Sequence, residues 1–209
     1  KNAFRYGRRE VKANIPAAPG TWSAIWTLAK NINENGAFWQ TQGVGNTAGP
    51  YCGVIDIMEQ NGKKSKTSGA FHFPLENGQN TYTTNSISVT DTANSWHVYA
   101  MEWSADTIEL SVDDVVFHTL DNAQNAYFDN EHFILLNIAM GGQLGGTIDA
   151  NFTSDIMEID YVRVYQLQPL SSGGIDNQNI GVNIYPNPST GRFYVEADDI
   201  INEIVIYDL

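Results

Sequence analysis

The chain has 209 residues, with 11 Lys and Arg against 24 Asp and Glu and a formal net charge of −13 at pH 7. This length suits one domain of ordinary size with an appendage, and the acidic balance argues against a basic face for nucleic acid. The single cysteine, Cys52, excludes an internal disulfide and a cysteine-based zinc site. The 18 Gly, 10 Tyr, 9 Phe and 5 Trp suit an all-β protein with many turns and an aromatic-lined groove.

The predicted strands are short, and turn signals recur roughly every ten residues. Strands are expected at residues 4–15, 21–28, 53–59, 68–73, 81–90, 96–103, 108–112, 115–120, 133–140 and 157–165. Residues 31–50 are polar and rich in glycine, so a long loop is expected there. This pattern predicts an all-β protein in which two antiparallel sheets pack as a sandwich or jelly roll.

Composition changes near residue 168. Residues 168–179 are polar with paired Ser and Gly, which is typical of a linker. Residues 180–209 return to strand-like alternation and predict a small β-rich unit. Because the chain starts at Lys1 and stops at Leu209 within an apolar-rich stretch, we expect the sandwich over 1–167 and the last unit both to be fragments.

The run G-V-I-D-I-M-E in the third expected strand is the main candidate for a chemical site. Alternation places Val54 and Asp56 on one face of a strand. A β-bulge at Ile57 or Met58 would bring Glu59 to the same face, because a bulge adds one residue to the strand. The run by itself is equally consistent with a core strand that ends in acidic residues.

Six motifs spread over the first 167 residues carry a family resemblance. They are Y-G-R-R-E-V-K-A at 6–13, G-T-W-S-A-I-W-T-L at 20–28, C-G-V-I-D-I-M-E at 52–59, W-H-V-Y-A-M-E-W at 96–103, L-N-I-A-M-G-G at 136–142 and M-E-I-D-Y-V-R-V-Y-Q at 157–166. In order and spacing they resemble glycoside hydrolase family 16, and its bacterial laminarinase-like β-glucanases in particular. The resemblance implies a concanavalin-like β-jelly roll with a glycan cleft on its concave sheet. Members begin several strands earlier, so it also implies that N-terminal strands are missing.

The resemblance assigns roles within the run. Retaining glycoside hydrolysis needs one carboxylate to attack the anomeric carbon and one acid to protonate the leaving oxygen. The family motif Glu-x-Asp-x-x-Glu makes Glu59 the acid/base and Asp56 its support, and it puts Val54 at the place of the nucleophile. The resemblance implies a domain of the endo-β-1,3(-1,4)-glucanase type. Because valine has no lone pair with which to attack the sugar, we expect this domain to hydrolyse glucans poorly. The alternative is an inactive, lectin-like β-glucan-binding module, and a transglycosylase is disfavoured because it needs the same nucleophile.

Five further residues are candidates for substrate binding. Trp22 and His72 match family cleft residues; Trp22 is a sugar platform by resemblance, whereas His72 could equally be structural. Asn137 interrupts an apolar strand and either faces the cleft or makes a structural hydrogen bond. Arg8 either reaches the cleft or pairs with an acidic neighbour. Trp39 is a weaker candidate from the long loop.

The other tryptophans and one acidic residue complete the expectations. Trp26, Trp96 and Trp103 are expected in the core, since aromatic side chains dominate such cores. Leu144 stands where the family often has tryptophan, which is expected to weaken or redirect a sugar subsite. Asp160 matches a family calcium ligand whose partners include absent N-terminal residues, so a structural Ca²⁺ is considered but no cofactor is required.

The tail carries a second resemblance. The stretch I-Y-P-N-P-S-T-G-R-F-Y-V-E at 184–196 resembles the C-terminal sorting domain of Bacteroidetes type IX secretion. It implies export across the outer membrane, removal of the tail and a secreted or cell-surface location. The expected partners are a β-glucan polysaccharide and the outer-membrane secretion machinery, with no nucleic acid, and the protein is expected to be a monomer.

Overall fold

The computed structural model describes residues 2–61, 64–75, 77–123 and 125–166, and the backbone of 182–185 and 194–197. The chain divides into two compact units, Lys1–Gln166 and Leu167–Leu209. In the second unit, strands β11 (Val182–Tyr185) and β12 (Tyr194–Ala197) pair antiparallel. The linker expected at 168–179 and the rest of the expected sorting unit lie outside the described residues.

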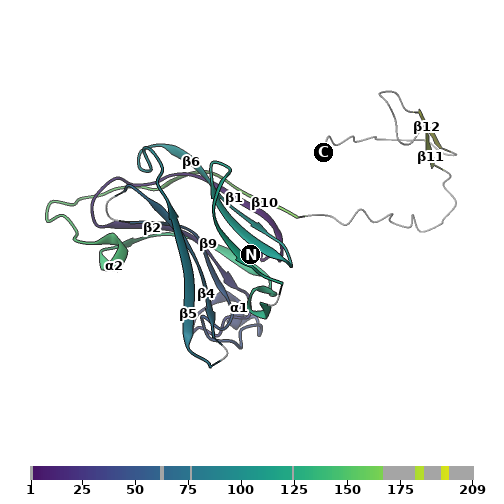
Figure 1. Ribbon diagram of the computed structural model, residues 1–209, viewed down its shortest axis with the longest axis horizontal. Coiled ribbons are helices and arrows are strands. Elements are labelled where there is room, and N and C mark those ends of the chain that lie inside the picture. The colour runs from purple at the N-terminus through teal and green to yellow at the C-terminus, as the bar shows by residue number, and fades with distance from the viewer. Residues whose placement is uncertain are drawn as a thin grey trace. The chain divides into compact units, whose positions relative to one another are not determined.

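The first unit consists of two five-stranded antiparallel sheets (Figure 1). The first sheet has the order β5 (Asn80–Ile87), β4 (Thr67–Pro74), β3 (Val54–Gln60), β2 (Thr21–Ala29) and β9 (His132–Met140). The second sheet has the order β10 (Glu158–Tyr165), β1 (Gly7–Asn14), β6 (Trp96–Trp103), β7 (Thr107–Val112) and β8 (Val115–Asp121). The described helical turns are α1 (Phe38–Thr41), η1 (Ala126–Phe128) and α2 (Gly142–Gly145). The predicted all-β sandwich is confirmed.

The core lies between the two sheets and explains the alternation within the strands. Its fully buried members include Val11, Ile25, Ile55, Ile57, Met58, Phe71, Tyr99, Met101, Trp103, Ile108, Leu110 and Phe128. The prediction for Trp103 is therefore confirmed. The prediction for Trp96 is wrong: this side chain is 45% exposed, and the Lys12 ammonium lies 5.8 Å from the centre of its ring.

The tight turn that the sequence predicted between β7 and β8 is present and sets the pairing of these two strands. Asp113 and Asp114 both have positive φ angles, 48° and 63°, and join β7 to β8. Two residues with φ > 0 form the kind of tight hairpin turn whose twist matches its strands. Within the described residues, none of the helices has the length and apolar character needed to cross a membrane.

One side of the sandwich is closed and the opposite side is open. Side chains of β5 and β8 meet on the closed side, where the Asn85 amide donates to the Phe117 carbonyl over 2.7 Å. On the other side, Leu136 of β9 pairs with the core residue Ile25 and so faces inward, yet it is 38% exposed. Val162 of β10 also faces inward and is 44% exposed. We call this open edge between β9 and β10 the seam.

Candidate active site

The β-bulge predicted in the acidic run is present in β3. The register between β3 and β2 passes from Asp56 directly to Met58, and the register with β4 shifts between Asp56 and Glu59. Ile57 is therefore the extra residue, and it and Met58 are both fully buried in the core. Because two successive side chains point inward, Glu59 returns to the face that carries Val54 and Asp56.

These three side chains line a pocket of about 520 Å³ on the face of the first sheet that points away from the core. The other residues that line it are Trp22, Ala24, Trp26, Gly49, Pro50, His72, Asn80, Asn137 and Ala139. They come from β2, β4 and β9, the start of β5 and the loop that precedes β3. A concave, largely apolar site with a few convergent polar groups is typical of small-ligand and substrate binding.

Glu59 has the properties of a proton donor. Burial and the negative charge of Asp56 raise the pKa of Glu59 to about 7, while a hydrogen bond from Trp22 and the nearby His72 act in the opposite direction. A carboxyl group that keeps its proton near neutral pH can transfer it to a leaving oxygen. The surroundings of Glu59 therefore favour its protonated form in the pocket near neutral pH.

Asp56 is 8% exposed and is held by His72 on the neighbouring strand. Its Oδ2 lies 2.7 Å from Nε2 of His72. That hydrogen bond raises the pKa of His72, and the charges of Asp56 and Glu59 add to it, while burial opposes the shift. The Tyr82 ring packs on His72, with ring centres 5.3 Å apart. His72 therefore both lines the pocket and fixes the orientation of Asp56.

Val54 brings no carboxylate to the pocket. Among the described residues that line the pocket, Asp56 and Glu59 are the carboxylic acids. Val54 pairs across the strands with His72 and contributes only methyl groups to the wall. Retaining hydrolysis needs a second carboxylate about 5–5.5 Å from the acid, and Asp56 is already bound to the imidazole.

Two tryptophans of β2 face the pocket, although only Trp22 was expected there. The Trp22 indole N–H donates to Oε1 of Glu59 over 3.1 Å. Trp26 was expected in the core; it is partly buried and packs against the cluster that contains Leu28 and Ala29, but it also lines the pocket. Its indole N–H donates to Oδ1 of Asn137 over 2.8 Å. Strand periodicity could have shown this, because residues 22 and 26 of one strand share a face. The pocket-facing set of β2, which includes Trp22 and Trp26, is more apolar than the core-facing set, which includes Thr21, Ser23 and Thr27, and this favoured the core for Trp26.

A second pocket of about 420 Å³ shares Asn137 with the first. It is lined by Asn2, Phe38, Trp39, Phe133, Ile134, Leu135, Leu136 and Asn137. The Trp39 ring packs against Phe133 with centres 6.3 Å apart, and the Lys30 ammonium lies 5.4 Å from its ring centre. Trp39 thus lies beside the acidic pocket and not within it.

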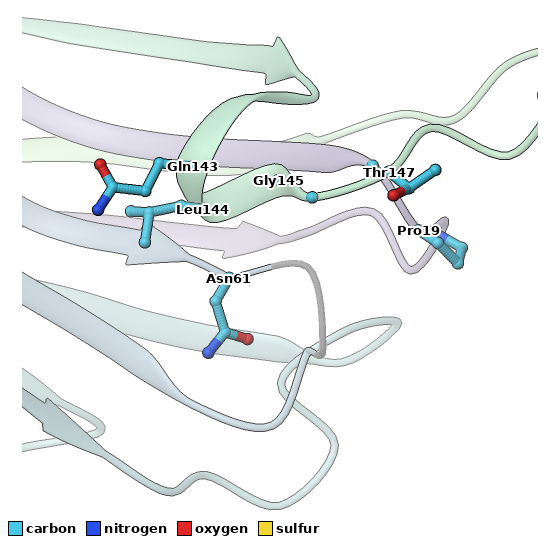
Figure 2. A pocket seen from close by; sticks show the side chains of 8 residues that line it. Pro19, Asn61, Gln143, Leu144, Gly145 and Thr147 are labelled. Atoms are coloured by element: carbon cyan, nitrogen blue, oxygen red, sulfur yellow. The ribbon is translucent and has the colours of Figure 1, made fainter.

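A third pocket, of about 500 Å³, lies where β3 ends (Figure 2). It is lined by Pro19, Gly20, Asn61, Gln143, Leu144, Gly145, Gly146 and Thr147. Figure 2 shows Gln143 and Leu144 on α2 and Asn61 on the segment that follows β3. With Leu144 at the position where the family often has tryptophan, the described lining of this pocket contains no aromatic ring.

Arg8 and Asp160 lie in the second sheet, away from these pockets. The Arg8 guanidinium binds Glu10 and Asp114, each over 2.7 Å, so the structure shows the acidic pairing and not the cleft contact. Oδ2 of Asp160 lies 2.8 Å from the ammonium of Lys12. Calcium needs several oxygen ligands, and the described residues contain no group of three or more His, Cys, Asp or Glu able to hold a metal ion. Asp160 is thus engaged with Lys12, and a structural Ca²⁺ at this residue stays a prediction.

Comparisons with known proteins agree with this geometry. The chain is 32% identical over 179 residues to a beta-glucanase of Rhodothermus marinus, an alignment that covers 79% of this chain and 59% of the relative. It is 29% identical to a beta-1,3-glucan-binding protein of Penaeus monodon, over 68% of this chain and 44% of that protein. The chain thus spans less than two thirds of either relative.

Solved structures show the same fold. LamAcat from Zobellia galactanivorans superposes with a TM-score of 0.75 and 46% identity, covering 79% of this chain and 66% of that one. A LamA variant with one glutamate replaced by serine, in complex with laminaritriose and laminaritetraose, gives a TM-score of 0.75 and 47% identity, with coverage of 79% and 67%. The model of glycosyl hydrolases family 16 matches residues 1–163. The chain therefore belongs to glycosyl hydrolases family 16.

Proposed function

We propose that this domain binds a β-1,3- or mixed-linkage β-1,3-1,4-glucan in the pocket of Asp56 and Glu59. We further propose that it is an endo-β-glucanase of the retaining type whose turnover is impaired by Val54. The observation that carries the proposal is the bulged strand, which sets an acid with a pKa of about 7 beside a supporting carboxylate and a valine. The glucan-directed names of the relatives support the choice of substrate.

The impairment follows from the chemistry of retention. A retaining enzyme forms a glycosyl ester on its nucleophile, and water then releases the sugar. Val54 offers no oxygen for that ester. Loss of a nucleophile that acts together with a base costs on the order of 10⁶ in rate in well-studied hydrolases. Glu59 can donate a proton to the leaving oxygen, but no carboxylate at position 54 then attacks the anomeric carbon.

Replacing Val54 by glutamate tests the proposal directly. Val54→Glu is expected to raise the release of reducing sugar from a β-1,3-glucan by on the order of 10³-fold or more. Val54→Gln is the matched control, because glutamine has nearly the same size but cannot form the ester. Equal turnover by the unaltered chain and Val54→Glu would contradict the proposal.

A glucan-binding module without hydrolysis is the second candidate, and Val54 is the observation that favours it. A LamA variant that lacks one glutamate is found in complex with laminari-oligosaccharides, and one relative is named as a beta-1,3-glucan-binding protein. Incubation with an α-glucosyl fluoride donor and an acceptor sugar separates the two. An intact acid/base site without its nucleophile joins the sugars, whereas a pure binding module leaves both unchanged.

We also propose that the protein is secreted or displayed at the cell surface. This proposal rests on the sorting-domain resemblance at 184–196, and it makes the outer-membrane secretion machinery a second partner. Deleting residues 184–196 from the protein in its native host is expected to move it from the medium or surface to the periplasm. Fractionation with an antibody against the first unit measures this, and unchanged export would contradict it.

A further inference from the structure

Trp22 and Trp26 present their indoles to the same pocket but donate to different partners. The Trp22 N–H reaches Oε1 of Glu59 at 3.1 Å, whereas the Trp26 N–H reaches Oδ1 of Asn137 at 2.8 Å. Trp22 thus contacts the proposed acid itself, and Trp26 contacts a neutral amide. The two residues form a matched pair for separating an effect on the acid from an effect on the pocket wall.

A glycine-rich turn lies beside the Trp22 side chain. A Cβ added to Gly142 would lie 3.4 Å from Cζ3 of Trp22, and one added to Gly145 would lie 3.4 Å from its Cβ. The turn is tied to the start of β2 by a hydrogen bond of 2.7 Å from the Gly141 N–H to the Gly20 carbonyl. At Gly145 the close approach is to the Gly20 carbonyl, which an added Cβ would meet at 2.9 Å, so glycine lets α2 lie close to the start of β2 and beside Trp22.

The hydrogen bond uses one of the two carboxyl oxygens of Glu59. An indole N–H only donates, and the carbonyl oxygen of a protonated carboxyl group accepts better than its hydroxyl oxygen, so this hydrogen bond favours Oε1 as the carbonyl oxygen. The acidic proton then belongs on Oε2. A donor to the carboxylate also favours its ionised form, and this opposes the effects of burial and of Asp56. His72 is the remaining charged group that acts on Glu59, in the same direction as Trp22.

We propose that Trp22 is a positioning residue for Glu59, holding Oε1 so that the proton on Oε2 is directed at the glycosidic oxygen. This role rests on the proposed function of Glu59 as the acid. It is separate from the role of Trp22 as a stacking platform for sugar. A phenylalanine at this position keeps most of a stacking surface but removes the N–H.

The inference can be tested in the unaltered chain by NMR. The indole N–H resonance of Trp22 is expected to follow the ionisation of Glu59, with a midpoint near the pKa of about 7. The indole resonance of Trp26, whose partner does not ionise, is expected to change less. A Trp22 resonance that stays constant while Glu59 ionises would overturn the inference without bearing on glucan binding.

Matched variants provide the second measurement. Trp22→Phe is expected to raise the pKa of Glu59 by about one unit, the size of one hydrogen bond to a charged group, and Trp26→Phe is expected to leave it in place. Combined with Val54→Glu, Trp22→Phe is expected to lower kcat about tenfold and move the alkaline limb of the pH profile upward. If Trp22→Phe raises KM alone, with the same pH profile, Trp22 is only a platform. Inactivity of Val54→Glu itself would instead count against the proposed function.

Discussion

At the scale of single residues, the site is a set of carboxyl groups whose environments differ. Asp56 is buried and binds an imidazole, while Glu59 is partly buried and receives one indole N–H. The negative charge of Asp56 is a cause of the raised pKa of Glu59. Two carboxyl groups that share a site in this way usually divide into a carboxylate and a proton donor.

Replacing Asp56 by asparagine is expected to lower the pKa of Glu59 from about 7, because a negative neighbour is removed. It is also expected to lower the pKa of His72, whose raised value depends first on its hydrogen bond to Asp56. NMR titration of both side chains measures the two shifts. Asp160→Asn, in the second sheet, is the control and should change neither, and a pKa of Glu59 that stays near 7 in Asp56→Asn would contradict the coupling.

The raised pKa of Glu59 sets the sign of the pH dependence of stability. The folded state binds the Glu59 proton more tightly than the unfolded chain does, where the ordinary pKa is 4.5. The stability that Glu59 contributes is therefore complete below pH 4.5 and is lost as the pH rises through about 7. Hydrolysis by Val54→Glu needs the same proton, so its rate is expected to fall at high pH, with an upper limb above about 7 because the new carboxylate raises the pKa of Glu59 further.

At the scale of elements, the bulge in β3 depends on its neighbour β4. Gly69 lies between Ser68 and Ala70, which pair with the residues on either side of the bulge. A Cβ at Gly69 would approach the backbone oxygen of Asp56 to 2.9 Å and Leu110 to 2.5 Å. Glycine at this position therefore leaves the space that the bulged backbone and the core need.

Gly69→Ala is expected to lower the free energy of unfolding by about 1–3 kcal/mol, the usual cost of overpacking. Because the new methyl group presses on the Asp56 backbone, the pKa of Glu59 is expected to shift as well. Urea denaturation and NMR titration measure the two effects. Ser86→Ala, on the exposed part of β5, is the control. If Gly69→Ala has the same free energy of unfolding as the unaltered chain, the expectation is contradicted, because β3 and β4 would then move apart to admit the methyl group without cost.

The sequence predicted the elements better than the contacts between them. Strand periodicity and the motif spacing predicted the bulge and the common face of Val54 and Glu59, because both are local properties of one strand. The pairing of Asp56 with His72 needed the register between two strands, which no single strand encodes. Trp26 was placed in the core because the more apolar face of β2 lines the pocket, while Thr21, Ser23 and Thr27 lie on the face that packs on the second sheet.

At the scale of the whole molecule, the two sheets place chemistry and charge on separate surfaces. The pocket with its acid pair lies on the first sheet, while Arg8, Asp114 and Asp160 form ion pairs on the second. Ion pairs at such exposed positions contribute little to stability. The apolar core between the sheets therefore carries most of the stability, and the seam between β9 and β10 is where that core meets solvent.

The seam also bears on how the molecules behave at high concentration. Among the described strands, β9 pairs only with β2 and β10 only with β1. His132 at the start of β9 also pairs with Phe4, but no described strand pairs with the outer edges beside half-exposed Leu136 and Val162. Such edges are templates for strand addition and aggregation. Light scattering is expected to show self-association that rises with concentration and that Val162→Lys reduces, whereas Val115→Lys, exposed on β8, leaves it unchanged. A molecular mass that stays at the monomer value at all concentrations would contradict this and support the monomer predicted from the sequence. It would mean that the open edge is too short for two molecules to form a joint sheet across it.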